Sequence, residues 1–140
     1  MDIEAAFTAY LLTRTGLTAS IDRRLHADET PQDVDLSKQT AVVYSQVSPD
    51  EKLHTHDGQN ALESPYYQFT VYAPGLQGRP TAKSISAQLK AALCDYVGTM
   101  GGLEIQYIKL TNELYDTQHP GDGVSVSTCD LEFEINYVRS

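Results

Sequence analysis

Two histidines and an aspartate stand close together in a polar stretch near the middle of the 140-residue chain. His54 and His56 are two positions apart, so on a strand their side chains would share one face, and Asp57 follows directly. Imidazole and carboxylate groups are ligands of protein-bound zinc, but a structural zinc site normally needs four ligands. His26 and His119 lie in other segments without motif spacing. The sequence therefore favours a solvated loop whose histidines titrate near neutral pH, and we expect no metal and no other cofactor.

The remaining chemistry-bearing residues lack the partners that catalysis needs. Glu104, Glu132 and Glu134 are expected on one face of a terminal hairpin, but nothing gives two of them the different environments that paired acid–base carboxylates require. A phosphate-binding loop needs glycine and lysine side by side, whereas Lys83 stands well after Gly78. The chain also lacks a Gly-x-Ser-x-Gly element. We therefore expect a protein that is not an enzyme.

The two cysteines, Cys94 and Cys129, lie far apart in segments that are predicted to be a helix and a strand. Each is expected to be a small core residue in a reducing compartment. The start of the chain lacks the basic region of a secretion signal, and no run approaches the roughly 20 apolar residues that cross a bilayer. We expect synthesis in a cytoplasm and no membrane association.

The charge of the chain limits its partners. The sequence has 19 acidic and 10 basic residues, for a formal net charge of −9. Proteins that coat nucleic acid need clustered cations, and the only adjacent basic pair is Arg23-Arg24. DNA near this protein is expected to pass without specific binding. The length and the 41% hydrophobic content predict a single domain over residues 1–140 that can hold a core without disulfides or metal.

The spacing of apolar residues predicts the elements. Apolar positions recur every three to four residues over 2–14, where Thr15-Gly16 ends the pattern, and again over 80–97, so both segments are expected to be helices. Strands are predicted at 21–25, 40–47, 66–72, 103–114 and 124–138. The expected fold class is α+β, a mostly antiparallel sheet of about five strands with two helices, in the order α-β-β-β-α-β-β, and a long C-terminal β-hairpin.

The terminal hairpin changes phase along its length. From Cys129 onward the apolar residues of the last strand are at odd positions, but Val124 and Val126 are at even ones, and the partner strand switches in the same way. Either a bulge intervenes, or the half near the turn buries its other face against a neighbour. Strands of this length would reach about 40 Å, so we expect the tip to protrude. The apolar side chains expected to make partner contacts there are Ile108, Leu110, Leu114, Val124 and Val126.

Five segments, spread over nearly the whole chain, together carry a resemblance to a known family. They are a helix with Ala6-Phe7 and Tyr10-Leu11-Leu12, the strand Ala41-Val42-Val43-Tyr44, the run Pro65–Ala73, a helix with Ala82, Ile85, Leu89 and Leu93, and the closing Leu131-Glu132-Phe133-Glu134-Ile135. In order and spacing they resemble the head-to-tail joining proteins, also called tail completion or tail terminator-like proteins, of long-tailed bacteriophages and prophages. The chain departs from that family in having Tyr72 where a tryptophan is usual and a longer central loop, Ser48–Ser64.

The resemblance implies a structural virion protein. Such a protein forms a hexameric ring at the head–tail interface, between the tail tube protein and the head connector or stopper protein. The resemblance also allows the subunits to be monomers before they assemble. A ring that DNA traverses benefits from an acidic lumen. The lumen candidates are Asp50, Glu51, Glu104, Glu132 and Glu134. The long loop Ser48–Ser64 is the candidate docking surface for the connector, with Leu53, His54 and His56 as contact residues.

Two other functions stay open from the sequence. An acidic inhibitor or immunity-type module that binds a basic protein, such as a nuclease, would have the same net charge but would not need the phase change in the hairpin. A small enzyme that uses His54 or His56 would need a second catalytic group, and the sequence supplies none.

Overall fold

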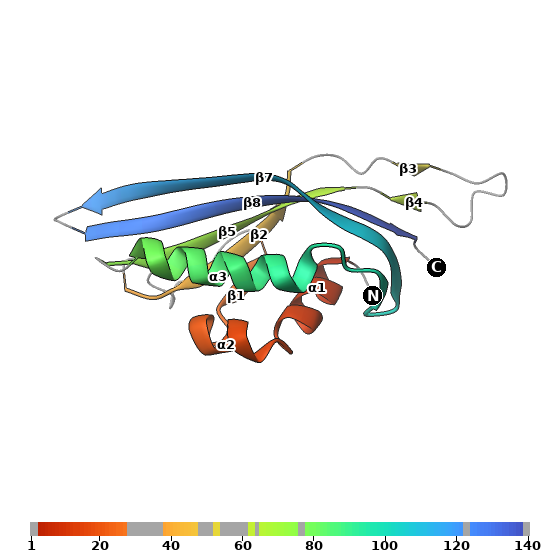
Figure 1. Ribbon diagram of the computed structural model, residues 1–140, viewed down its shortest axis with the longest axis horizontal. Coiled ribbons are helices and arrows are strands. Elements are labelled where there is room, and N and C mark those ends of the chain that lie inside the picture. The colour runs from red at the N-terminus through yellow and green to blue at the C-terminus, as the bar shows by residue number, and fades with distance from the viewer. Residues whose placement is uncertain are drawn as a thin grey trace.

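The fold is a twisted sheet with all of its helices on one face (Figure 1). The computed structural model describes residues 3–27, 38–47, 52–53, 62–63, 65–75, 78–121 and 124–138. In this part of the chain the helices are α1 (Ile3–Leu11), α2 (Thr15–Ile21) and α3 (Gly78–Leu93). The strands are β1 (Leu25–Ala27), β2 (Ala41–Gln46), β3 (Lys52–Leu53), β4 (Leu62–Glu63), β5 (Tyr66–Pro74), β6 (Gly98–Met100), β7 (Leu103–Gly121) and β8 (Val124–Val138).

The strands form one mixed, mostly antiparallel sheet in the order β1-β2-β5-β8-β4-β3. Strand β7 pairs with the other edge of β8, and β6 pairs with β7. Only the short β1 runs parallel to its neighbour, β2, among the strand pairs described. The predicted α+β class, with its mostly antiparallel sheet and C-terminal hairpin, is confirmed. The sheet has more strands than the expected five. The short strands β1, β3, β4 and β6 have only two or three residues each, which is too few for an alternating pattern to show in the sequence.

The prediction for the segment after the first helix is wrong. Helix α1 ends at Leu11, and a second helix, α2, occupies the place of the predicted stop and of the start of the predicted strand at 21–25. Leu17 and Ile21, one helical turn apart, are both fully buried. Gly16 does not end a helix here but lies in the first turn of α2, next to the side-chain amide of Gln88 in α3. Helix α2 thus lies against α3.

An aromatic cluster centred on Phe7 joins α1 to the sheet. The ring of Phe7 meets those of Tyr44, Tyr67 and Phe69 nearly edge-on, with centroid distances of 6.0, 5.3 and 5.6 Å. All four side chains are buried. Edge-to-face contacts at these distances place the positive rim of one ring against the negative face of another, which adds to the hydrophobic gain from burial. The cluster therefore holds α1 against β2 and β5.

We expect Phe7→Ala to lower the free energy of unfolding by about 3–5 kcal/mol, because it removes the ring at the centre of this cluster and leaves a cavity. Urea denaturation measures the change. Ala5→Ser, on the exposed side of α1, is the control and is expected to change it by less than about 0.5 kcal/mol. Equal effects of the two substitutions would contradict a central role for Phe7.

Gly78 fixes where α3 begins on the sheet. A Cβ at this buried position would lie 2.4 Å from the carbonyl oxygen of Ala73 and 3.0 Å from Oγ of Ser127. The backbone oxygen cannot move without disturbing β5, so the first turn of α3 packs against β5 and β8 only when this residue is glycine.

Gly78→Ala is therefore expected to destabilise the fold by about 1–3 kcal/mol through overpacking, although alanine is the better helix former. Thermal unfolding followed by circular dichroism would show the loss. The matched control, Ser84→Ala on the exposed side of the same helix, should leave the melting temperature unchanged or slightly raised. An unaltered melting temperature for Gly78→Ala would show that α3 can shift without cost.

Candidate interaction surface

The helices leave one face of the sheet without a helical layer (Figure 1). Side chains alternate between the two faces of a strand, and the odd positions of β8 from Cys129 to Tyr137 are buried in the core. Their even neighbours point away from the helices and are half-buried at Asp130, Glu132 and Glu134. We call this side of β2, β5, β8 and β7 the open sheet face. The candidate acidic residues Glu132 and Glu134 lie on it.

Glu134 is held between two tyrosine hydroxyls on the open sheet face. Tyr66 of β5 donates a hydrogen bond to Oε2 at 2.8 Å, and Tyr107 of β7 donates one to Oε1. The hydrogen bond from Tyr107 is the larger cause, and that from Tyr66 the next, of a lowered pKa for the Glu134 carboxyl group. The same bond to Glu134 is the main cause of the raised pKa of Tyr107. This carboxylate therefore keeps its charge at lower pH than a free glutamate does.

The other two carboxylates of β8 also accept hydrogen bonds from hydroxyl groups. Thr70 of β5 donates to Oδ1 of Asp130 at 2.8 Å, and Thr111 of β7 donates to Oε1 of Glu132 at 3.1 Å. Each acidic side chain of β8 is thus positioned by a neighbouring strand. Three negative charges in a row along one strand would repel one another, and neutral donors hold them without cancelling their charge.

Tyr66→Phe combined with Tyr107→Phe should raise the pKa of Glu134, because both donors to the ionised form are lost. Titration of the Glu134 side-chain carboxyl carbon by NMR measures this directly. Since the pKa is lowered in the folded protein, the bonds add stability above the unfolded-state pKa, and this stability is lost as the pH falls through the folded-state pKa. The difference in melting temperature between wild type and the double variant should therefore be present at pH 7 and shrink in acid.

A control with Tyr72→Phe separates this effect from the general loss of a hydroxyl group. Tyr72 is half-buried on the same face, and no described hydrogen bond joins it to Glu134. Its substitution should leave the titration of Glu134 in place. A Glu134 pKa that is unmoved in the double variant would show that the two tyrosines do not set it.

The acidic residues predicted for a lumen fall into two groups. Glu132 and Glu134 are two residues apart on the open sheet face, and the register that pairs Glu104 with Val138 places Glu104 on that face as well. Lys109, paired with Glu134 across the hairpin, is a cation on the same surface. Asp50 and Glu51 lie outside the described residues. The sequence thus predicted the shared face of three carboxylates but not the hydroxyl donors that hold two of them.

The phase change of β7 comes from bulges, one of the two explanations that the sequence allowed, whereas β8 is regular and carries Val126 on the open sheet face. The register of β7 against β8 shifts between Ile105 and Tyr107, between Leu110 and Asn112, and again near the tip. Strand β8 itself pairs with β5 without interruption from Glu134 to Val126. The bulged strand therefore changes which of its residues face the core, while β8 stays regular.

The structure distributes the predicted hairpin contacts unevenly. Ile108 and Val126 are only 1% and 3% exposed, so this chain already covers both of them. The expectation that they need an outside neighbour failed because Ile108 packs in the core cluster, and Val126 is covered within this chain at a position where β8 pairs with both β5 and β7. Leu110 is partly buried against the core, whereas Leu114 is 57% exposed on the open sheet face. The side chains of Val124 and Leu53, and His54 and His56 altogether, lie outside the described part.

The core-facing side of β7 is tied to α3 by charged groups that sequence analysis missed. Lys90 of α3 forms an ion pair with Glu113 at 2.8 Å. The ring of Tyr115 lies beneath two cations of α3, with Arg79 and Lys83 at 5.7 and 5.8 Å from its centroid. Burial is the main cause that raises the pKa of Tyr115 to about 12. Only the end of the hairpin beyond α3 projects from the body (Figure 1).

Comparison with known proteins finds solved structures that share this fold. No family model matches the chain, and no curated protein matches it in sequence. A solved chain from a structure described as the virion of a native gene transfer agent particle superposes with a TM-score of 0.68, at 16% identity, over 98% of both chains. The two chains share a fold. A second solved structure, which carries no functional name, superposes with a TM-score of 0.54, at 14% identity, over 94% of each chain.

Other kinds of site have little support in the described ranges. There, no three histidine, cysteine, aspartate or glutamate side chains gather in a way that could hold a metal ion. No helix of that part of the chain combines the length and the apolar character needed to cross a membrane. Cys129 is buried in the core and Cys94 half-buried at the end of α3, and both are free thiols.

Proposed function

We propose that the protein is a structural component of a phage-like virion, without enzymatic activity, that forms a ring at the head–tail interface. The ring completes the tail, joins it to the head connector and lets DNA pass. The observation that carries this proposal is the likeness in fold to a chain of a gene transfer agent virion over 98% of both chains. The resemblance of the sequence to head-to-tail joining proteins points to the same position in the particle.

In this ring, which we take to be a hexamer, the open sheet face lines the lumen. Among the described side chains, five carboxylates lie on that face against one lysine. They are Glu104, Asp116, Asp130, Glu132 and Glu134. Like charge keeps the phosphates of DNA from binding as they pass. The lowered pKa of Glu134 supports this role, because the carboxylate stays charged when the medium becomes acidic.

The other partners are the tail tube protein and the head connector or stopper protein. We assign connector docking to the segment 48–64, with Leu53, His54 and His56 as contacts. Asp50 and Glu51 of the same segment are further candidates for the acidic lumen. Among the predicted hairpin contacts whose side chains are described, Leu114 is the exposed one and remains the candidate for a partner contact. A leucine with 57% exposure beside carboxylates suits a contact that becomes buried only on assembly.

Disruption of the gene in its source phage or prophage tests the proposal. Electron microscopy of the induced lysate is expected to show DNA-filled heads and separate, unjoined tails. Complementation by the wild-type gene should restore joined particles, which controls for effects on neighbouring genes. Normal, complete particles from the disrupted gene would contradict a virion role, and the alternative of an acidic inhibitor would then predict capture of a basic protein partner by the purified chain.

A further inference from the structure

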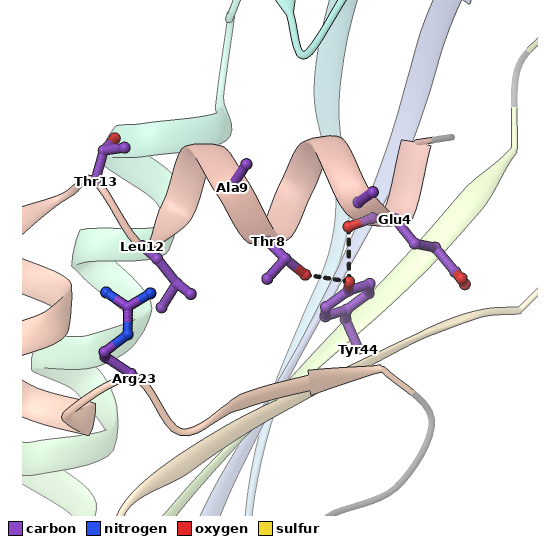
Figure 2. A pocket seen from close by; sticks show the side chains of 8 residues that line it. Glu4, Thr8, Ala9, Leu12, Thr13, Arg23 and Tyr44 are labelled. Carbon is purple, nitrogen blue, oxygen red and sulfur yellow. Dashed lines mark hydrogen bonds between the residues drawn. The ribbon is translucent and has the colours of Figure 1, made fainter. Parts of the chain in front are cut away.

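A groove of about 650 Å³ lies on the helical side of the molecule, away from the open sheet face. It runs along the exposed side of α1, above β2, and ends at the turn that follows α2 (Figure 2). The residues that line it are Glu4, Ala5, Thr8, Ala9, Leu12, Thr13, Arg23 and Tyr44. The role proposed for the open sheet face makes no use of this groove.

Arg23 enters the groove from a strained backbone position. Its φ is 68°, and that of Asp22 before it is 49°, so two successive residues other than glycine adopt the left-handed conformation. This conformation costs an arginine about 1 kcal/mol or more, and such outliers concentrate at functional sites. In Figure 2 the side chain extends toward Leu12 and Thr13. The strained turn therefore presents a guanidinium group at one end of the groove.

The neighbouring arginine shows that this presentation is specific to Arg23. Arg24 donates hydrogen bonds to the backbone carbonyl and the hydroxyl of Thr40, and its guanidinium lies 3.7 Å from the carboxylate of Asp22. The backbone carbonyl of Arg23 accepts a hydrogen bond from the N–H of Leu25 at 2.9 Å, but its side chain makes no hydrogen bond or ion pair with any described residue. One arginine thus has a structural role, while the other is exposed and keeps its five donors available.

The hydroxyl groups at the floor of the groove already have hydrogen-bond partners within the chain. The hydroxyl of Tyr44 donates to the carbonyl oxygen of Glu4 at 2.8 Å, so the hydroxyl of Thr8, at 2.7 Å, donates to the oxygen of Tyr44 (Figure 2). Beside this satisfied pair, Ala9 and Leu12 offer small and apolar contacts. Glu4 lies at the end opposite Arg23 (Figure 2). An occupant with a carboxylate at the Arg23 end and an aliphatic group along α1 therefore fits the groove.

The chain itself carries an excess of such carboxylates. Nine of its 19 acidic residues and eight of its ten basic residues have described side chains, so the remaining residues include ten acidic and two basic ones. The described side chains thus sum to a charge of only 8 − 9 = −1, and most of the net charge of −9 belongs to the remaining residues. A second copy of this chain offers the groove a high local supply of carboxylates.

We propose that the groove receives a carboxylate-bearing segment of a second copy of this chain, with Arg23 pairing with the carboxylate. The inference rests on the proposed function in one respect: a ring needs a contact between two different surfaces, which repeats from copy to copy until it closes. A groove on one copy and an acidic segment on the next meet that requirement. The guanidinium binds a carboxylate with two parallel hydrogen bonds, which fixes the orientation of the pair.

Arg23→Lys turns the groove into a reporter of its own partner, because it keeps the charge and introduces a primary amine. A carbodiimide joins such an amine to a carboxylate only where the two are in contact. Two preparations of the full-length variant are treated with the carbodiimide. One is a mixture of ¹⁴N- and ¹⁵N-labelled protein, and the other is assembled particles from the complemented phage. Mass spectrometry is expected to find peptides that link position 23 of one isotope to an acidic residue of the other. Lys83, exposed on α3, is the internal control and should form few such links.

A second variant measures the strength of the contact. Arg23→Asn removes the charge but suits the left-handed backbone, so the melting temperature should stay near that of wild type. Self-association, followed by sedimentation over a concentration series, should weaken about tenfold, as expected for loss of a charge-assisted pair. High salt should weaken the association of the wild type in the same way. Lys83→Gln, which removes one positive charge elsewhere, should not change it.

Three results would overturn the proposal: links from position 23 only within one copy, links only to a different virion protein, or no links in either preparation. Failure of the proposed function gives a different pattern. If particles are complete without the gene but the mixed-isotope links are present, the contact between copies stands and the role in the particle does not. If heads and tails separate but no such link forms, the contact fails and the role stands.

Discussion

The pairing of β8 along both of its edges is the constraint on which the rest of the structure depends. On one edge β8 pairs with β5 over nine residues and then with β4, and on the other it pairs with β7 over most of its length. Its odd residues thereby form the centre of the core, where Phe133 meets Phe69 at 5.7 Å. Because this register is uninterrupted against β5, every irregularity of the hairpin must be taken up by β7.

Local patterns predicted the elements that have a clear periodicity. Strand β5 and helix α3 follow from alternation and from a helical apolar stripe, and the common face of Glu132 and Glu134 follows from a spacing of two. Helix α2 was missed because it has only two buried apolar residues, and its stability comes from packing against α3, which no local pattern records. The pairing of Tyr66 and Tyr107 with Glu134 was missed for the same reason, since it depends on the register of three strands.

The described charges are divided unevenly between the two sides of the molecule. The open sheet face has five described carboxylates against Lys109, whereas the helical side bears most of the described cations together with the acidic residues Glu4, Asp22, Asp95 and Glu113. These cations are Arg14, Arg23, Arg24, Arg79, Lys83 and Lys90. In the proposed ring, the face with more carboxylates would be turned toward the DNA, where it would repel the phosphates and so prevent them from binding. The helical side, with Arg23 in its groove, would then be turned toward the neighbouring copies.

The double pairing of β8 also has a mechanical consequence. Hydrogen bonds between antiparallel strands lie perpendicular to the strand axis. A pull on the hairpin along that axis therefore loads the bonds to β5 and to β7 in shear, many at once, and none can break alone. A pull across the axis would instead open the bonds one after another from the tip. The domain should accordingly resist tension best along the hairpin, and peel most easily at a right angle to it.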